Sequence, residues 1–359
     1  MNETYRQTIA RLIEASPFSI NTDIQISGRP PSTASSEFLT NKEQGDWAER
    51  VVLSAINDNS LEYIALQYGR SDSLAAGDLG FSEFYLTYQN ELNQIGKKPD
   101  ILIFRRSDIS NFSDINLDDC TIVKKAVAAI EVRSSSFLST NYSSFMDNRT
   151  HLAEQECWRI REIILQEPFL SALRDESPKI FDLISNASIN TFRELKFKCP
   201  SWSSSTTSIL QELYVHLKAL KAQIEVLNKR DYLSITPKLE DLALVNRWIQ
   251  HFGVPHYYLQ VFFDKACIIS FQEILEISSD SSKKGIIFSV ERDKKNQGKT
   301  TIKINIRVGR EILSFIDMPN HKSALKKLER GRLLYYVTFE GGKGYLDPAI
   351  FSQEIINNV

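Results

Sequence analysis

Short apolar runs bounded by turn-forming residues recur along the chain and predict buried strands. Two of them, at 98–104 and 126–135, lie close together, and the first carries Asp100 while the second carries Glu131. An unpaired buried carboxylate is costly, so neighbouring strands that each present one indicate a shared cation. Arg133 lies two residues beyond Glu131 and therefore points to the same face of its strand. Two acids and a cation in this arrangement suit a hydrated Mg²⁺ ion and a phosphate.

Helical periodicity precedes these strands. Residues 40–56 have apolar positions at helical spacing, and Thr40 is predicted to begin the helix as part of a capping box. Glu49 lies on the apolar face of this helix by i+3, i+4 and i+7 spacing. An acid on that face either points into the cation site or bonds a buried arginine. A strand at 61–69 and a helical or mixed segment at 81–95 follow.

The pattern changes between 137 and 235, where strongly helical segments replace the strands. We expect a helical insertion at 137–235 that separates an N-terminal part of the core, 1–136, from its remainder, 236–359. Thr236 as N-cap and Pro237 as first residue predict a helix that ends before Gly253. Two apolar strands follow that helix, as in a crossover that extends a sheet. The predicted class is α/β (α+β), with a mixed central sheet flanked by helices.

Overall charge gives little direct indication of a partner. The chain has 359 residues and a net charge of -2, so no basic field covers the whole protein. The four cysteines are far apart and form no CxxC pair, which argues against a zinc site or a disulfide framework. We interpret them as reduced thiols of a cytoplasmic protein. The chain shows no signal-peptide pattern and no apolar run of roughly 20 residues, so no membrane association is expected.

Positive charge is concentrated in the C-terminal third. Strands at 286–290 and 300–308 form a predicted basic β-hairpin. A two-stranded ribbon fits the major groove of DNA, where Arg or Lys pairs with guanine and Asn with adenine. The alternative, a solvated hairpin, is equally consistent with the pattern. The candidate DNA-contacting residues are Lys294, Lys295, Lys299, Lys303, Asn305 and Arg307, with Thr301, Lys303, Asn305 and Arg307 expected on one face. A second basic stretch, 322–332, is predicted to hold phosphates from a helix.

A loop at 27–36, rich in small hydroxylated residues, is a further candidate for binding. It is either a surface linker or a loop that contacts a DNA backbone, because hydroxyls, backbone N–H groups and arginine bind phosphates. In the second interpretation the contacts come from Arg29, Ser32, Ser35 and Ser36.

The sequence Pro99-Asp100 followed by Glu131-Val132-Arg133 resembles the PD-(D/E)XK nucleases. Together with 38–49 and 248–264, these segments are most similar to type II restriction endonucleases of the AccI-type group, over roughly 29–275. The resemblance implies a restriction-endonuclease-like core, Mg²⁺ dependence and a homodimer. It also implies cleavage of double-stranded DNA at a short palindromic or near-palindromic site. The role of the helical insertion, whether shape, dimerisation or DNA clamping, stays open.

One residue departs from the family pattern, since Arg133 stands where the family usually has lysine. Arginine can hold a phosphate but cannot deprotonate, so it is a poor base. We expect Asp100 and Glu131 to bind Mg²⁺ and Arg133 to neutralise charge on the scissile phosphate. Glu49 would support a second metal or orient the attacking water. Lys238, near the point where the chain re-enters the core, is the candidate to replace the missing lysine.

Two alternatives stay open on sequence alone. The first is a repair or junction-resolving nuclease on the same core, which would cleave according to DNA structure. The second is a non-cleaving DNA-binding protein with a decayed site, which Arg133 supports. A small-molecule enzyme is disfavoured, because the chain has no glycine-rich nucleotide loop, no G-x-S-x-G and no metal-spaced His/Cys cluster.

Overall fold

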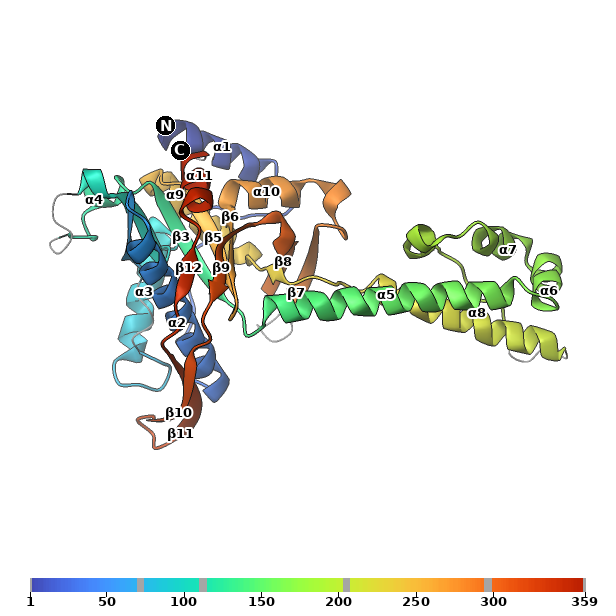
Figure 1. Ribbon diagram of the computed structural model, residues 1–359. Helices are drawn as coiled ribbons and strands as arrows, with labels where there is room; N and C mark the ends of the chain where they lie inside the picture. The colour runs from blue at the N-terminus through green and yellow to red at the C-terminus, as the bar shows by residue number, and fades with distance from the viewer. Residues whose placement is uncertain (1, 70–73, 110–114, 203–206, 294–298, 358–359) are drawn as a thin grey trace. The chain divides into compact units, whose positions relative to one another are not determined.

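The computed structural model describes residues 2–69, 74–109, 115–202, 207–293 and 299–357 (Figure 1). The chain divides into two compact units. We call them the sheet unit, Met1–Ser139 with Leu233–Val359, and the helical unit, Thr140–Tyr232. None of the described helices carries an apolar stretch that could span a membrane.

A mixed sheet forms the centre of the sheet unit. Its strands, in spatial order, are β1 (Tyr63–Gln67), β2 (Ile101–Arg105), β3 (Ala128–Ser134), β5 (His256–Val261), β6 (Ala266–Ser270), β9 (Arg310–Ile316) and β12 (Gly344–Leu346). Strands β3 and β5 are parallel, and the other neighbours in this sheet are antiparallel. The predicted mixed α/β class is therefore confirmed.

The apolar run of β2 shows why this sheet is buried on both faces. Ile101 and Ile103 join the cluster beneath α2 (Ser36–Asn59) and α11 (Pro348–Asn357). Leu102 and Phe104 join the cluster under α1 (Asn2–Glu14), α9 (Leu239–Phe252) and α10 (Phe271–Ser279). Successive strand residues point to opposite faces, so a continuous apolar run is what a sheet covered by helices on both sides requires.

Two predicted helix starts are wrong. Helix α2 begins at Ser36, one turn before Thr40, because the Ser35 hydroxyl caps it by accepting the Phe38 N–H at 3.0 Å. Thr40 lies inside the helix, and its hydroxyl accepts the N–H of Val337 instead. Helix α9 begins at Leu239 with Lys238 as its N-cap.

The predicted end of α9 is confirmed. Gly253 follows the helix with a φ of +73°, a left-handed conformation that glycine adopts without steric cost.

The basic hairpin is confirmed as an antiparallel pair, β7 (Phe288–Asp293) and β8 (Lys299–Asn305), with β4 (Ser234–Ile235) on the other edge of β8. Phe288, Ile302 and Ile304 point into the sheet unit's core. One face of the hairpin is therefore structural.

The helix predicted within 322–332 is wrong. Residues Asn320–Lys327 form β10, which pairs along its whole length with β11 (Leu333–Glu340). The β-branched and aromatic side chains of β11 favour an extended partner, and Gly331, with a φ of +83°, lies in the turn that reverses the chain.

The helical unit has a hydrophobic core of its own. Its main helices are α5 (Ser139–Ile164), α6 (Phe169–Glu176), α7 (Pro178–Ser185) and α8 (Ser208–Leu227). Helix α8 buries Leu213, Leu217, Leu220, Ile224 and Leu227, which follow the helical period. All buried residues of this core cluster lie between Ala153 and Leu227, within the unit.

Candidate active site

Asp100 and Glu131 are brought together by two adjacent antiparallel strands. Asp100 immediately precedes β2, and Glu131 lies in β3, whose Ile130 pairs with Ile101. The Asp100 carboxylate accepts the backbone N–H of Val132 through Oδ2 at 2.7 Å. This hydrogen bond attaches the first acid to the strand that carries the second. The side chain of Glu131 is only 2% exposed.

Two cations hold the same oxygen of Glu131. Arg133 Nη2 lies 3.0 Å from Glu131 Oε1, and Lys97 Nζ donates a short hydrogen bond to that atom. Asp241, in the first turn of α9, lies 3.1 Å from Arg133 and 3.5 Å from Lys97. We call these four residues, Lys97, Glu131, Arg133 and Asp241, the ion network. It balances two acids, the buried Glu131 and the half-buried Asp241, with two cations, as burial of charge requires.

The two central acids have opposite electrostatic environments. Burial disfavours the charged form of Glu131, but Lys97 and Arg133 overcome this effect and lower the pKa of Glu131. Burial raises the pKa of Asp100 well above its usual range, and the charges of Glu131 and Glu49 add to the effect. Burial, followed by the charge of Asp46, raises the pKa of Glu49 to about 7. Asp100 and Glu49, unlike Glu131, therefore have too little positive charge around them to offset burial and their like-charged neighbours, and a divalent cation would supply it.

The available oxygens fit a hydrated magnesium ion. Among the residues that the structure describes, Glu131 Oε2 is buried without a hydrogen-bond partner. Asp100 lines a hollow of about 90 Å³ together with Lys97, Gly69, Glu91 and Tyr88. The described residues contain no cluster of three or more acids, histidines or cysteines that could enclose a metal. Two carboxylates with free oxygens nevertheless suit Mg²⁺, which keeps several waters and rarely needs an all-protein cage.

Comparison with known proteins identifies the family. The family model described as AccI restriction endonuclease matches residues 3–357. The chain belongs to the AccI restriction endonuclease family. The AccI-family enzymes are type II endonucleases, hydrolases that cleave DNA phosphodiester bonds at specific sites, and DNA is the substrate that membership implies. The chain matches no curated protein and no solved structure.

In this AccI-family enzyme, three of the residues singled out from the sequence lie together: Asp100, Glu131 and Arg133. Glu49 in α2 accepts a hydrogen bond from Gln67 at 3.4 Å and is close enough to Asp100 to affect its pKa. Lys238 is the N-cap of α9 and forms a backbone bridge with Thr301. The lysine that contacts Glu131 is Lys97.

Sequence reasoning missed Lys97 and Asp241. Lys97 lies only three residues before Asp100, so its position next to the strand was a detectable signal. Asp241 lies 108 residues beyond its partner Arg133. An acid in the first turn of a helix is ordinarily explained by the helix dipole, so nothing local indicated its role in the site.

The DNA-contact candidates of the AccI-family chain have varied environments. Arg29 and Ser32 are exposed, Ser35 caps α2, and Ser36 is the first residue of that helix. Lys294 and Lys295 lie outside the described residues, and Lys299 is the first residue of β8.

The polar face expected of the hairpin ends at Asn305: Thr301, Lys303 and Asn305 alternate along β8, but Arg307 does not continue the pattern. Thr301 is only 5% exposed, and β8 ends at Asn305, whose side chain accepts the N–H of Arg307 at 3.0 Å. A 3-10 turn at Ile306–Val308 follows the strand, so Arg307 leaves the strand alternation. Arg307 is exposed and Lys303 is half-buried.

Proposed function

We propose that this AccI-family enzyme uses Mg²⁺ to cleave double-stranded DNA at a short palindromic or near-palindromic site, acting as a homodimer. The observation that supports the proposal best is the pairing of Asp100 with Glu131 on adjacent strands, with Glu131 Oε2 lacking a partner among the described residues. A dimer with two-fold symmetry presents two equivalent sites, which suits a symmetric DNA sequence. The sheet unit would form a restriction-endonuclease-like core, and the helical unit would be an insertion into it.

Asp100 and Glu131 would hold the metal. When bound, Mg²⁺ supplies Lewis-acid stabilisation of the negative charge on the scissile phosphate. Lys97 and Arg133 both contact Glu131 Oε1, so they keep this carboxylate ionised and fix its orientation. The other oxygen, Oε2, is the atom that remains for the metal. Glu49, which lies close to Asp100, would orient the attacking water.

In place of the lysine usual in the family, the two cations of the ion network would have separate roles. Lys97 lines the hollow beside Asp100, and we assign it the neutralisation of charge on the phosphate. Arg133 lies between Glu131 and Asp241, and its guanidinium cannot give up a proton, so we assign it a positioning role. Lys97, not Lys238, is the lysine that we propose for the phosphate.

DNA would be bound by hydroxylated and basic residues of the sheet unit. We propose that the loop with Arg29 and Ser32 contacts the backbone, together with the α2 N-terminus at Ser35 and Ser36. Lys303 and Arg307 of the hairpin would supply further contacts.

Digestion of phage DNA tests the proposal. The purified protein is incubated with the DNA and Mg²⁺, with EDTA as the control, and fragment ends are sequenced. Discrete fragments that require Mg²⁺ and share one palindromic end sequence are expected. A smear would favour a structure-directed repair nuclease, and intact DNA with a retarded band would favour a binding protein with a decayed site. Sedimentation of the protein–DNA complex measures the dimer independently.

A further inference from the structure

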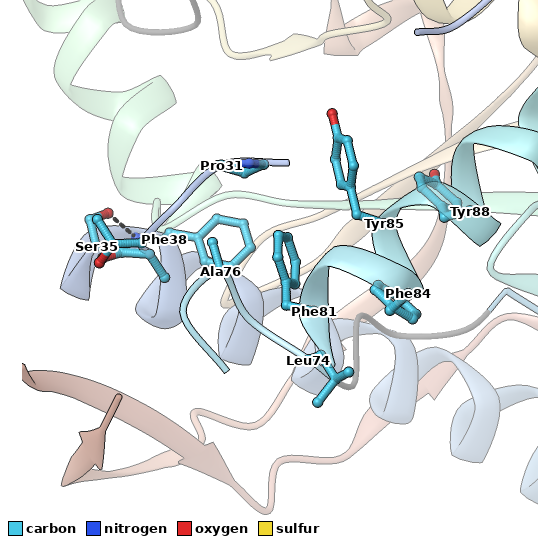
Figure 2. A pocket seen from close by; sticks show the side chains of 11 residues that line it. Pro31, Ser35, Phe38, Leu74, Ala76, Phe81, Phe84, Tyr85 and Tyr88 are labelled. Atoms are coloured by element: carbon cyan, nitrogen blue, oxygen red, sulfur yellow. Dashed lines mark hydrogen bonds between the residues drawn. The ribbon is translucent and has the colours of Figure 1, made fainter. Parts of the chain in front are cut away.

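A second and larger hollow lies on the sheet unit, with a volume of about 340 Å³ (Figure 2). One wall is helix α3 (Phe81–Ile95), which contributes Phe81, Phe84, Tyr85 and Tyr88. These four residues follow i, i+3, i+4, i+7 spacing and therefore share one face of the helix. Phe38, from the first turn of α2, forms part of the opposite side. We call this hollow the aromatic pocket.

The pocket-lining residues of α3 precede its two buried residues along the same side of the helix. The buried residues of α3 are Gln89 and Leu92, neither of which lines the pocket. Phe38 is 43% exposed and Tyr88 is 39% exposed. The rings of Phe81 and Tyr85 lie 5.8 Å apart. Aromatic side chains gathered in an open hollow of this volume are typical of a ligand pocket.

The aromatic pocket adjoins the candidate active site. Phe84 and Tyr88 line both the aromatic pocket and the smaller hollow that contains Asp100 and Lys97. A molecule that enters the larger hollow therefore lies next to the hollow lined by Asp100, one of the two carboxylates proposed to hold the metal.

The rim of the aromatic pocket suits a phosphate. Thr33 and Ser35 line it, and Arg332 donates a hydrogen bond to Thr33 Oγ1 at 3.3 Å. Helix α2 begins at Ser36, so the positive end of its dipole also lies at this rim. An apolar aromatic interior with a cationic, hydroxylated rim is complementary to a nucleotide, whose base is flat and apolar on its faces and whose phosphate is anionic.

We propose that the aromatic pocket holds one nucleobase of the DNA substrate, turned out of the duplex close to the phosphate that is cleaved. This proposal rests on the proposed function. Bases stack readily on aromatic side chains, which offsets the loss of stacking in the duplex. The Tyr85 ring provides such a face, and the hydroxyls of Thr33 and Ser35 provide hydrogen-bonding groups for the base edge or the phosphate.

Fluorescence of 2-aminopurine tests the proposal once digestion has given the recognition site. The analogue is placed at each position of the site in turn, and the duplex is bound in Ca²⁺ in place of Mg²⁺. A several-fold rise in fluorescence is expected at one position, or at its symmetric pair. Tyr85→Ala and Phe38→Ala should abolish the rise and weaken binding by about 5- to 150-fold, the range for loss of one base–aromatic stack. Tyr85→Phe, which keeps the aromatic ring, should preserve the rise in fluorescence.

Leu86→Ala is the matched control. Leu86 lies on α3 and is 52% exposed, but it does not line the pocket. This variant should bind DNA and raise the fluorescence as the unmodified protein does. Because Phe38 is also substantially exposed, Phe38→Ala should retain the melting temperature even if Tyr85→Ala does not fold.

Two results would overturn the proposal while leaving the proposed function intact. One is discrete cleavage with unchanged fluorescence at every position of the site. The other is a dimer that Phe38→Ala converts to monomers without any fluorescence change, which would assign the pocket to a second copy of the chain. Absence of discrete fragments would remove the proposed function and this inference together.

Discussion

At the residue scale, the site depends on how two neighbouring acids are compensated. Glu131 has two cations on one oxygen, whereas Asp100 has mainly like charges and burial around it. The opposite pKa shifts of the two acids follow directly from this difference. The surroundings therefore hold the pKa of Glu131 below, and that of Asp100 well above, the usual range of a carboxyl group.

Replacement of Lys97 by methionine tests its assignment to the phosphate. We expect single-turnover cleavage by Lys97→Met to slow by about 10²–10³-fold, the usual effect of removing one group that stabilises transition-state charge. Lys265→Met is the control, because Lys265 pairs with Glu311 at 3.0 Å, in a partly exposed ion pair. Lys97→Arg should recover part of the lost rate. A rate for Lys97→Met within threefold of the unmodified enzyme would contradict the assignment.

Local sequence pattern could predict only part of this site. Asp100, Glu131 and Arg133 were accessible because the two-residue strand period fixes which side chains share a face. Lys97 precedes its strand and follows no period, and Asp241 comes from a helix that only the tertiary fold brings to the site. Lys238 was chosen for its position in the sequence, and the structure instead places it at the cap of that helix.

At the element scale, basic residues misled the prediction of secondary structure. The charges at 322–332 were interpreted as a helix, although β10 pairs along its full length with β11. Charge is compatible with either structure, so the apolar and aromatic partner strand decides. The start of α2 is also ambiguous in the sequence, because Ser35 and Thr40 are both good capping residues. In the structure Ser35 caps the helix by accepting the Phe38 N–H, whereas Thr40 accepts the N–H of Val337.

The β10–β11 hairpin is attached to the loop before α3 by an ion pair whose effect should depend on pH. Asp78 Oδ2 lies 2.6 Å from Lys326 Nζ and also accepts the Ala75 N–H. Burial disfavours the charged form, but these two contacts prevail and lower the pKa of Asp78. A lowered acid pKa stabilises the fold above the unfolded-state pKa of about 3.9, and the effect is lost as pH falls through the folded-state value.

We therefore expect Asp78→Asn to reduce the free energy of unfolding by about 1–2 kcal/mol at neutral pH. Urea unfolding should show this difference narrowing as the pH falls below about 4. Glu340→Gln is the control, because the Lys322–Glu340 pair has side chains 65% and 57% exposed, and its loss should cost less than about 0.5 kcal/mol. If Asp78→Asn lowers the free energy of unfolding by the same amount at every pH, the ion pair is not the cause of the loss.

At the scale of the whole molecule, the two units have separate cores. The core cluster of the helical unit contains only residues from that unit, and the chain enters and leaves it once, near Ser139 and Leu233. Hydrophobic periodicity indicated helices in this region, because their apolar spacing is local. Strand β3 pairs with β5 in the central sheet, although the whole helical unit separates these two strands in the sequence. No local pattern encodes the register of such a distant pair.

Excision of Thr140–Tyr232, with a flexible Gly/Ser linker in its place, tests the independence of the sheet unit. We expect the shortened protein to unfold cooperatively, with a melting temperature within about 5 °C of the full chain. Circular dichroism should show the loss of helix and a single transition. A shortened protein that is insoluble or melts without cooperativity would show that the helical unit is needed for the fold of the sheet unit.

Asp100→Asn, measured for cleavage and for binding, is the most direct test of the proposed catalytic site. The substitution keeps the size of the side chain but removes the charge proposed to hold the metal. Single-turnover cleavage in Mg²⁺ should slow by at least about 10³-fold, which corresponds to about 4 kcal/mol of barrier. The affinity of the variant for the same duplex in Ca²⁺ should stay within a few-fold of that of the unmodified enzyme, because phosphate contacts away from the metal supply most of the affinity. Cleavage at an unchanged rate would place the reacting phosphate elsewhere and contradict the assignment of Asp100 and Glu131 as the active site.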